Sequence, residues 1–442
     1  MAIKVGMVSL GCPKNQVDAE LMMADIRKAG YELCEDAALA DVAVINTCGF
    51  IESAKAESIE FILEFTTLKE EGRIKAVIIT GCLAERYREE VAREIPEADA
   101  VLGIGSNKDI VAAIEKALAG EKTLSFGPKE DLPLSGDRIL STIPFYAYLK
   151  IAEGCDNRCS YCAIPGIRGG FRSRPMEDVL KEAATLAEWG VEELVVVAQD
   201  TTRYGEDLYG KPALAKLLEE LCRIDGFRWI RVLYAYPHRI TDELIDVIAR
   251  EEKICKYLDL PMQHVNGEIL RRMNRPGDEQ TLSELVEKLR QRVPGIVLRT
   301  TFMTGFPGET EEQFEQLCAF VAKHKLERVG CFAYSAEEDT PAAEFPDQVE
   351  EEVKARRCEL LYQLCEEMMQ EKNAALEGQT LLCVTEGFDR YAECYFGRSA
   401  ADAPDIDGKV FFKSSQKLRL GQFVSVLVDE VVDGEPFGTA IF

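Results

Sequence analysis

Three cysteines in one short loop constrain this chain more than any other feature. Cys155, Cys159 and Cys162 follow a largely apolar run at residues 146–151 that reads as a strand. Cysteine thiolates this close together bind soft metals or iron–sulfur clusters. Three ligands are one short of a closed four-cysteine site, so a four-iron cluster bound here would keep one iron open to an exogenous ligand. The loop therefore predicts a metal centre with a free coordination position.

A zinc loop or a set of buried thiols is the alternative interpretation. Zinc would need a fourth Cys or His at a matching spacing, and the next cysteine along the chain is Cys222. Fifteen cysteines would suggest disulfides only in a small secreted chain. The start of the sequence reads as a strand and not as a signal peptide, and no apolar run approaches the roughly 20 residues that span a bilayer. We expect a cytoplasmic protein with reduced cysteines and no membrane contact.

Residues 3–120 alternate short apolar strands with helices, a pattern that predicts a parallel α/β sheet. Cys12, Cys48 and Cys82 each fall just past a predicted strand and beside a glycine. Because the carboxyl ends of parallel strands line one crevice, these cysteines can meet in space. We predict a second iron–sulfur cluster there, again with three ligands. The alternative is that the three thiols are buried as small apolar side chains.

The rest of the chain divides into two further units. Residues 121–140 are rich in Gly, Pro and charges and read as a linker. Six β-α units then predict a partial barrel whose chemistry lies at the strand carboxyl ends. After a long helix, about five short strands predict a small barrel of the oligonucleotide-binding type. The expected domains are residues 3–120, 141–370 and 379–442.

The charge of the chain bears on its partner. The formal net charge is −26, which repels phosphate backbones unless a local basic patch intervenes. Residues 379–442 hold six Lys or Arg against ten acids, a balance of 6 − 10 = −4. This sign favours a basic protein partner for the terminal barrel over RNA.

The chain resembles the methylthiotransferases of the radical S-adenosylmethionine superfamily over essentially its whole length. The resemblance is carried by the three-cysteine loop, by Ser9-Leu10-Gly11-Cys12-Pro13-Lys14-Asn15-Gln16-Val17-Asp18, and by Arg398-Ser399-Ala400-Ala401-Asp402-Ala403-Pro404-Asp405-Ile406-Asp407-Gly408. It implies an N-terminal cluster domain, a radical barrel and a C-terminal TRAM barrel. Within the family, the chain is similar to the branch that modifies ribosomal protein S-twelve on an aspartate β-carbon. The tRNA-modifying branch typically has Gln-Met-Asn after the first cysteine.

The resemblance also implies roles for individual residues. It gives Cys155, Cys159 and Cys162 to the radical cluster and Cys12, Cys48 and Cys82 to the auxiliary cluster. Tyr161 occupies the position beside the adenine, and Gln199 and Asp200 stand where the methionine end of the cofactor binds. Gly305, Gly308 and Glu309 resemble a second glycine-rich cofactor segment, although Phe306 and Pro307 depart from its usual spacing. A plain turn with a glutamate near a helix start is the alternative for that segment.

The implied cofactors are two 4Fe-4S clusters and S-adenosyl-L-methionine. In the implied reaction, a 5′-deoxyadenosyl radical removes a hydrogen from the substrate, the auxiliary site delivers sulfur and a second S-adenosylmethionine gives the methyl group. The implied partners are ribosomal protein S-twelve and a reductant such as flavodoxin or ferredoxin, with no direct nucleic-acid contact except on the ribosome. Two competing functions are a tRNA adenosine methylthiotransferase and a non-catalytic iron–sulfur or RNA-binding protein.

Overall fold

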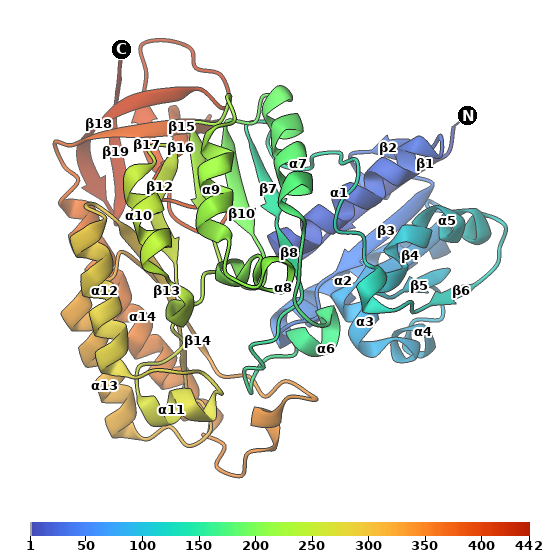
Figure 1. The fold of residues 1–442 in the computed structure, drawn as a ribbon. Coiled ribbons are helices and arrows are strands. Elements are labelled where there is room, and N and C mark those ends of the chain that lie inside the picture. The colour runs from blue at the N-terminus through green and yellow to red at the C-terminus, as the bar shows by residue number, and fades with distance from the viewer. Residues whose placement is uncertain (1) are drawn as a thin grey trace.

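Two parallel six-stranded sheets and a closed five-stranded barrel follow one another along the chain in the computed structural model, which describes residues 2–442 (Figure 1). The predicted fold class, parallel α/β units followed by a small β-barrel, is confirmed. None of the helices in residues 2–442 is long and apolar enough to cross a membrane.

The first sheet has the order β2-β1-β3-β4-β5-β6, with every neighbouring pair parallel. Helices cover both of its faces, α1 (Pro13–Lys28) and α5 (Ile110–Leu118) on one and α2 (Glu52–Glu70), α3 (Cys82–Tyr87) and α4 (Glu89–Glu94) on the other. Burial on both faces explains why the central strands read as continuous apolar runs. The strands are β1 (Lys4–Ser9), β2 (Glu32–Cys34), β3 (Val42–Thr47), β4 (Ala76–Gly81), β5 (Ala100–Leu102) and β6 (Thr123–Ser125).

The predicted linker at 121–140 is wrong in part, because β6 lies inside it as the edge strand of the first sheet. Three residues at a sheet edge are too short to show a strand periodicity. Farther along, Arg138 is buried and forms ion pairs with Glu20 on α1 and Glu182 on α7 (Met176–Glu188). This segment therefore fastens the first sheet to the second.

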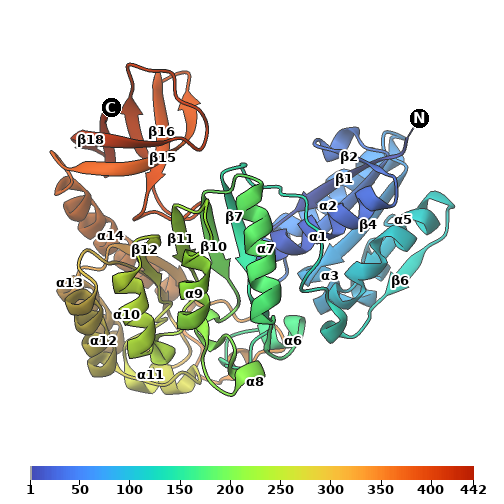
Figure 2. The ribbon, with the colours of Figure 1, turned by 45° about the horizontal axis from the view of Figure 1, so that its top comes forward.

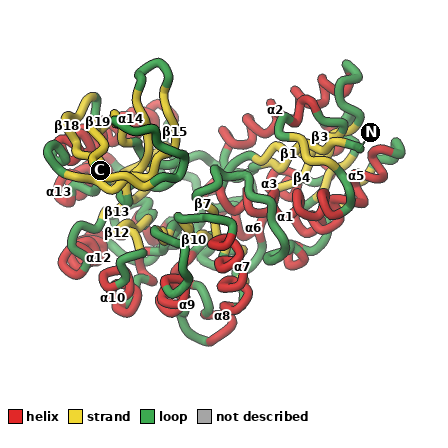
Figure 3. Tube along the Cα trace, turned by 90° about the horizontal axis from the view of Figure 1, so that it is seen from above, coloured by secondary structure: helices red, strands yellow, loops and turns green. Residues whose placement is uncertain are grey.

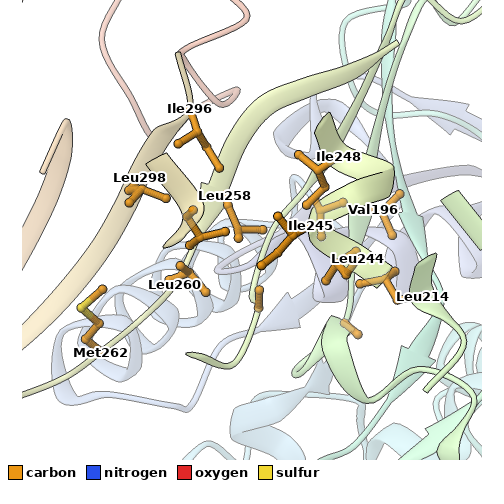
Figure 4. Packing of buried hydrophobic residues seen from close by; sticks show 14 of the residues in the cluster. Val196, Leu214, Leu244, Ile245, Ile248, Leu258, Leu260, Met262, Ile296 and Leu298 are labelled. Carbon is orange, nitrogen blue, oxygen red and sulfur yellow. The ribbon is translucent and has the colours of Figure 1, made fainter. Parts of the chain in front are cut away.

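The second sheet has the order β14-β13-β12-β11-β10-β7 and is entirely parallel. Helices α9 (Leu214–Cys222), α10 (Asp242–Arg250), α12 (Glu279–Arg292) and α13 (Glu311–His324) lie with α7 on its outer face, as Figures 1 and 2 show. Figure 4 shows the apolar core between them, where Ile245 of α10 lies beside Leu258 of the sheet. The strands are β7 (Tyr146–Lys150), β10 (Glu193–Val197), β11 (Trp229–Val232), β12 (Ile254–Asp259), β13 (Val297–Thr304) and β14 (Arg328–Ala333).

Helix α14 (Glu351–Ala374) packs on β14 and leads into the closed barrel, whose order is β15-β16-β17-β19-β18. Seen from above in Figure 3, this barrel lies apart from the N-terminal sheet. Its strands are β15 (Thr380–Asp389), β16 (Cys394–Ser399), β17 (Val410–Lys413), β18 (Phe423–Val432) and β19 (Glu435–Ile441).

The loop that follows β16 packs against the second sheet, and two of its aspartates form ion pairs with arginines of that sheet. Asp402 pairs with Arg328 at 2.7 Å, and the side chain of Asp407 lies 3.6 Å from Arg299. Both aspartates have side chains no more than 5% exposed. Two of the ten acids in residues 379–442 are therefore buried in ion pairs with the second sheet, and one of the six bases, Arg398, is likewise buried against Glu193 of β10, so the exposed part of the barrel keeps an acidic balance.

The same junction predicts a pH dependence. Glu193 is buried between Arg231 at 2.9 Å and Arg398 at 2.6 Å. Burial alone would raise the pKa of the Glu193 carboxyl, but Arg398 and Arg231 outweigh it and lower that pKa. We expect Glu193→Gln to lower the free energy of unfolding at pH 7 by about 3–5 kcal/mol, because two buried guanidinium groups lose their counter-charge.

A carboxyl with a lowered folded pKa stabilises the fold above its unfolded pKa, and this contribution is lost as the pH falls through the folded value. The gap between wild type and Glu193→Gln should therefore narrow below pH ~4.3, the ordinary glutamate pKa. Urea unfolding between pH 7 and 3 measures it. Glu192→Gln, at a half-exposed neighbouring position, is the control. A difference in unfolding free energy between wild type and Glu193→Gln that stays constant with pH would contradict a lowered Glu193 pKa.

Candidate metal and cofactor site

Three thiols gather at the carboxyl edge of the first sheet. Cys12 caps α1, Cys48 follows β3, and Cys82 begins α3 directly after β4. Gly11 has a φ of +86°, and a Cβ atom there would lie 2.7 Å from the Cys48 Sγ. Only glycine therefore leaves this approach to the thiols open. The structure brings together the three cysteines of the predicted auxiliary site.

The pKa values of the three auxiliary thiols shift in different directions. Burial raises the pKa of the Cys82 thiol to about 12, and burial likewise raises the pKa of Cys48. For Cys12, burial is opposed by the charges of Lys14 and Arg168, and the pKa is lowered. A charge on Cys12 also raises the pKa of each of the other two thiols. The three sulfurs are thus close enough to influence one another.

The second group of thiols lies on the loop between β8 (Ala152–Glu153) and α6 (Ile164–Arg168). Gly154 opens this loop at φ +77°, where a Cβ would lie 2.1 Å from the Gly170 carbonyl oxygen. Burial raises the pKa of the Cys155 thiol to about 11 and that of Cys162 to about 12. Charge on Cys159 contributes to both shifts, so these three sulfurs also lie near one another.

Both thiol groups have the donor chemistry of a multi-iron cluster. In a four-iron cluster each thiolate binds a different iron, so the three sulfurs need not converge on one point. The donor set of three soft thiols, beside glycines that leave space, fits that kind of cluster.

Arg275 is a site residue that sequence reasoning missed. Its guanidinium lies 3.6 Å from the Cys159 Sγ and 3.5 Å from the Tyr161 hydroxyl, and it donates to the Pro261 carbonyl at 2.6 Å. It also lies over the ring of Tyr236, 4.3 Å from the centroid. The Arg275 guanidinium therefore holds Tyr161, the predicted adenine contact, beside Cys159, a predicted cluster ligand. A lone arginine in a turn carries no motif.

Gln199 and Asp200 follow β10 and both contact the three-cysteine segment. Asp200 accepts a hydrogen bond from the Asn157 amide at 2.8 Å. Gln199 donates to Glu153, and its own Oε1 is buried without a partner within the described chain. An unpaired buried acceptor is costly, so it suits a donor supplied from outside, such as the ammonium of a bound amino acid.

Gly305, Gly308 and Glu309 lie after β13. The Glu309 carboxylate accepts from the Gly305 amide at 2.6 Å and from Arg357 at 2.7 Å, and lies 3.2 Å from His264 Nε2. These bonds support the interpretation of this segment as a turn that the Glu309 carboxylate stabilises. Contact of this segment with a cofactor stays a prediction.

A buried ion network joins the two thiol groups. Arg168 lies 2.6 Å from Asp18 and 3.3 Å from Glu153, and its other nitrogen lies 3.2 Å from the Cys82 Sγ. Lys150 pairs with the same two carboxylates, Asp18 and Glu153. Helix α1 accordingly packs beside β7. The network places the auxiliary thiols next to the strand that feeds the radical loop.

Comparisons with known proteins place this geometry in a family. Family models match at residues 4–103 (Uncharacterized protein family UPF0004), 149–321 (Radical SAM superfamily) and 378–441 (TRAM domain). The chain is 52% identical to the ribosomal protein uS12 methylthiotransferase RimO of Pelotomaculum thermopropionicum, over 97% of each chain. It is 47% identical to the protein of the same name from Clostridioides difficile, over 100% of this chain and 99% of the relative.

Solved structures agree at the level of the fold. The radical S-adenosylmethionine methyltransferase TsrM from Kitasatospora setae, with cobalamin and a [4Fe-4S] cluster bound, matches with a TM-score of 0.57 at 15% identity, over 77% of each chain. The cobalamin-dependent S-adenosylmethionine radical enzyme OxsB matches with a TM-score of 0.53 at 13% identity, over 84% of this chain and 56% of that one.

Proposed function

Since this chain belongs to the family of ribosomal protein uS12 methylthiotransferases named RimO, we propose that it adds a methylthio group to the β-carbon of an aspartate in uS12. It is a radical S-adenosylmethionine enzyme that uses S-adenosylmethionine and 4Fe-4S clusters. The observation that carries the proposal is the junction at Arg168, which touches Cys82 of one thiol group and Glu153 at the base of the other.

The two thiol groups divide the work. Cys155, Cys159 and Cys162 would hold the radical cluster, and Cys12, Cys48 and Cys82 the auxiliary cluster. When bound, the cofactors supply a carbon radical and a transferable sulfur, which side-chain bases cannot replace because an aliphatic C–H bond is too weak an acid. The protein then has to position the reactants and exclude water.

Several residues fit that positioning role. Gln199 offers its unpaired Oε1 and Asp200 its carboxylate to the amino end of S-adenosylmethionine. Tyr161, held by Arg275, would lie against the adenine. Gly305, Gly308 and Glu309 would contribute their backbone to the cofactor site.

The remaining assignments concern organisation and partners. We assign the auxiliary cluster to residues 3–120, the radical chemistry to 141–370 and a TRAM domain to 379–442. The reductant is a small electron carrier such as flavodoxin or ferredoxin, and the enzyme acts in the cytoplasm. The net charge of −26 argues against tRNA as the substrate, because like charges repel.

The test uses the full-length protein reconstituted with iron and sulfide, with S-adenosylmethionine, dithionite and either uS12 or bulk tRNA from the same organism. We expect 5′-deoxyadenosine, and a mass gain on uS12 equal to one methylthio group in place of one hydrogen. Tandem mass spectrometry should locate the gain on an aspartate. Modified tRNA together with unmodified uS12 would reverse the choice of substrate, and absence of 5′-deoxyadenosine would reject the enzyme.

A further inference from the structure

Lys14 carries a buried ammonium that no carboxylate in residues 2–442 pairs with, although the nearby Cys12 thiol and Tyr234 hydroxyl raise its pKa. Four lysines in the described chain are buried. Three of them form ion pairs with carboxylates: Lys55 with Glu52 and Glu337, Lys150 with Asp18 and Glu153, and Lys354 with Glu351. Lys14 is only 7% exposed, and no Asp or Glu between residues 2 and 442 pairs with it. A buried ammonium of this kind is costly unless a counter-charge arrives.

The surroundings of Lys14 place its ammonium at the meeting point of the two sheets. Lys14 lies two residues after Cys12, in the first turn of α1. Its Nζ lies 3.3 Å from the centroid of the Tyr234 ring, which follows β11 at the carboxyl rim of the second sheet. The Tyr234 carbonyl accepts a hydrogen bond from the Thr201 amide at 3.1 Å, directly after Gln199 and Asp200. The ammonium is thus beside both the auxiliary thiols and the cofactor rim.

The ring of Tyr234 does not replace a counter-ion. A cation over an aromatic face gains less free energy than an unpaired buried ion costs. Tyr234 itself is held at φ +60°, a backbone region that costs energy for a bulky residue and that clusters at functional sites. Both features are explained if a negatively charged ligand group completes the arrangement.

We propose that Lys14 binds the carboxylate of the substrate aspartate. The inference rests on the proposed function, in which the reacting β-carbon is bonded directly to that carboxylate. An ion pair with Lys14 would fix the carboxylate, and with it the adjacent β-carbon, between the auxiliary thiols and the cofactor rim. It would also select against a neutral group such as a purine, which leaves the ammonium without a counter-charge.

The Cys12 thiolate is the competing counter-charge, because it lies close enough for Lys14 to lower its pKa. A second cation, Arg168, also contacts the auxiliary thiols, 3.2 Å from the Cys82 Sγ, although Asp18 and Glu153 pair with it as well. Lys14 instead faces Tyr234 on the opposite sheet. The Lys14 ammonium therefore lies on the side of the auxiliary thiols that faces the second sheet.

The test is a binding cycle with the full-length protein, both clusters reconstituted. Dissociation constants are measured for uS12 and for uS12 in which the target aspartate is replaced by asparagine. Wild type should prefer the aspartate form by about 10- to 100-fold, the range for a hydrogen-bonded charge pair. Lys14→Met should lose this preference, while Lys28→Met, an exposed lysine on the same helix, should keep it.

Three outcomes decide the matter. If wild-type enzyme neither modifies nor binds uS12, both the proposed function and this inference fail. If wild type modifies uS12 but binds the aspartate and asparagine forms equally, the inference alone is overturned, and no enzyme variant is needed for that result. It is also overturned if Lys14→Met keeps the preference and changes only the iron content or reduction potential of the auxiliary cluster.

Discussion

Replacing Cys155, Cys159 and Cys162 together by alanine should abolish 5′-deoxyadenosine formation and lower the iron content from about eight to about four atoms per chain. Alanine offers no ligand atom, so the radical site loses its cluster and S-adenosylmethionine loses its binding iron. The auxiliary thiols are at the edge of the other sheet and keep their own four irons. Iron analysis and chromatography of the nucleoside products measure the two effects.

The complementary variant separates radical formation from sulfur transfer. Cys12→Ala, Cys48→Ala and Cys82→Ala together should also lower iron to about four atoms per chain, but this variant should still form 5′-deoxyadenosine. It should transfer no methylthio group to uS12. A control with Cys222, Cys318 and Cys358 replaced by alanine should keep all its iron, because these half-buried thiols lie outside both groups.

Two results would contradict this division. Iron that stays near eight atoms in either variant would show that the chosen cysteines are not ligands. Methylthio transfer by the variant without Cys12, Cys48 and Cys82 would remove the second site from the reaction.

Asp18→Ala should destabilise the fold by about 3–5 kcal/mol, because it leaves two buried cations with one carboxylate. Lys150 and Arg168 both pair with Asp18, and all three side chains are at most 2% exposed. Glu153 alone would remain to balance them. The loss should loosen α1 from β7 and with it the two thiol groups. Guanidinium unfolding of the metal-free protein measures the free energy.

The matched control lies on the same helix. Asp25 is 47% exposed and forms a surface ion pair with Lys28, so Asp25→Ala should cost about 0–1 kcal/mol. Equal losses in the two variants would mean that the buried network contributes no more than a surface pair.

Local patterns in the sequence predicted much of the fold and all six candidate ligands. The alternation of strands and helices needs only the period of apolar residues along a few turns. The three-cysteine loop needs only covalent spacing, and the dispersed cysteines follow from the rule that parallel strands end at one edge. The same reasoning failed at β6, whose three residues show no period and pair only with β5.

The tertiary structure alone decided how these parts meet. Asp18 and Arg168 are 150 positions apart, and Arg398 reaches Glu193 across 205 positions. Lys14 lies over Tyr234 from a different sheet. Such contacts form only when distant segments pack together. They cannot be predicted from the sequence, because ion pairs between distant residues produce no periodic pattern in it. The sequence by itself determined which sulfurs are available, whereas packing determined that the two groups share one junction and that the Lys14 ammonium lies over Tyr234 without a carboxylate partner in residues 2–442.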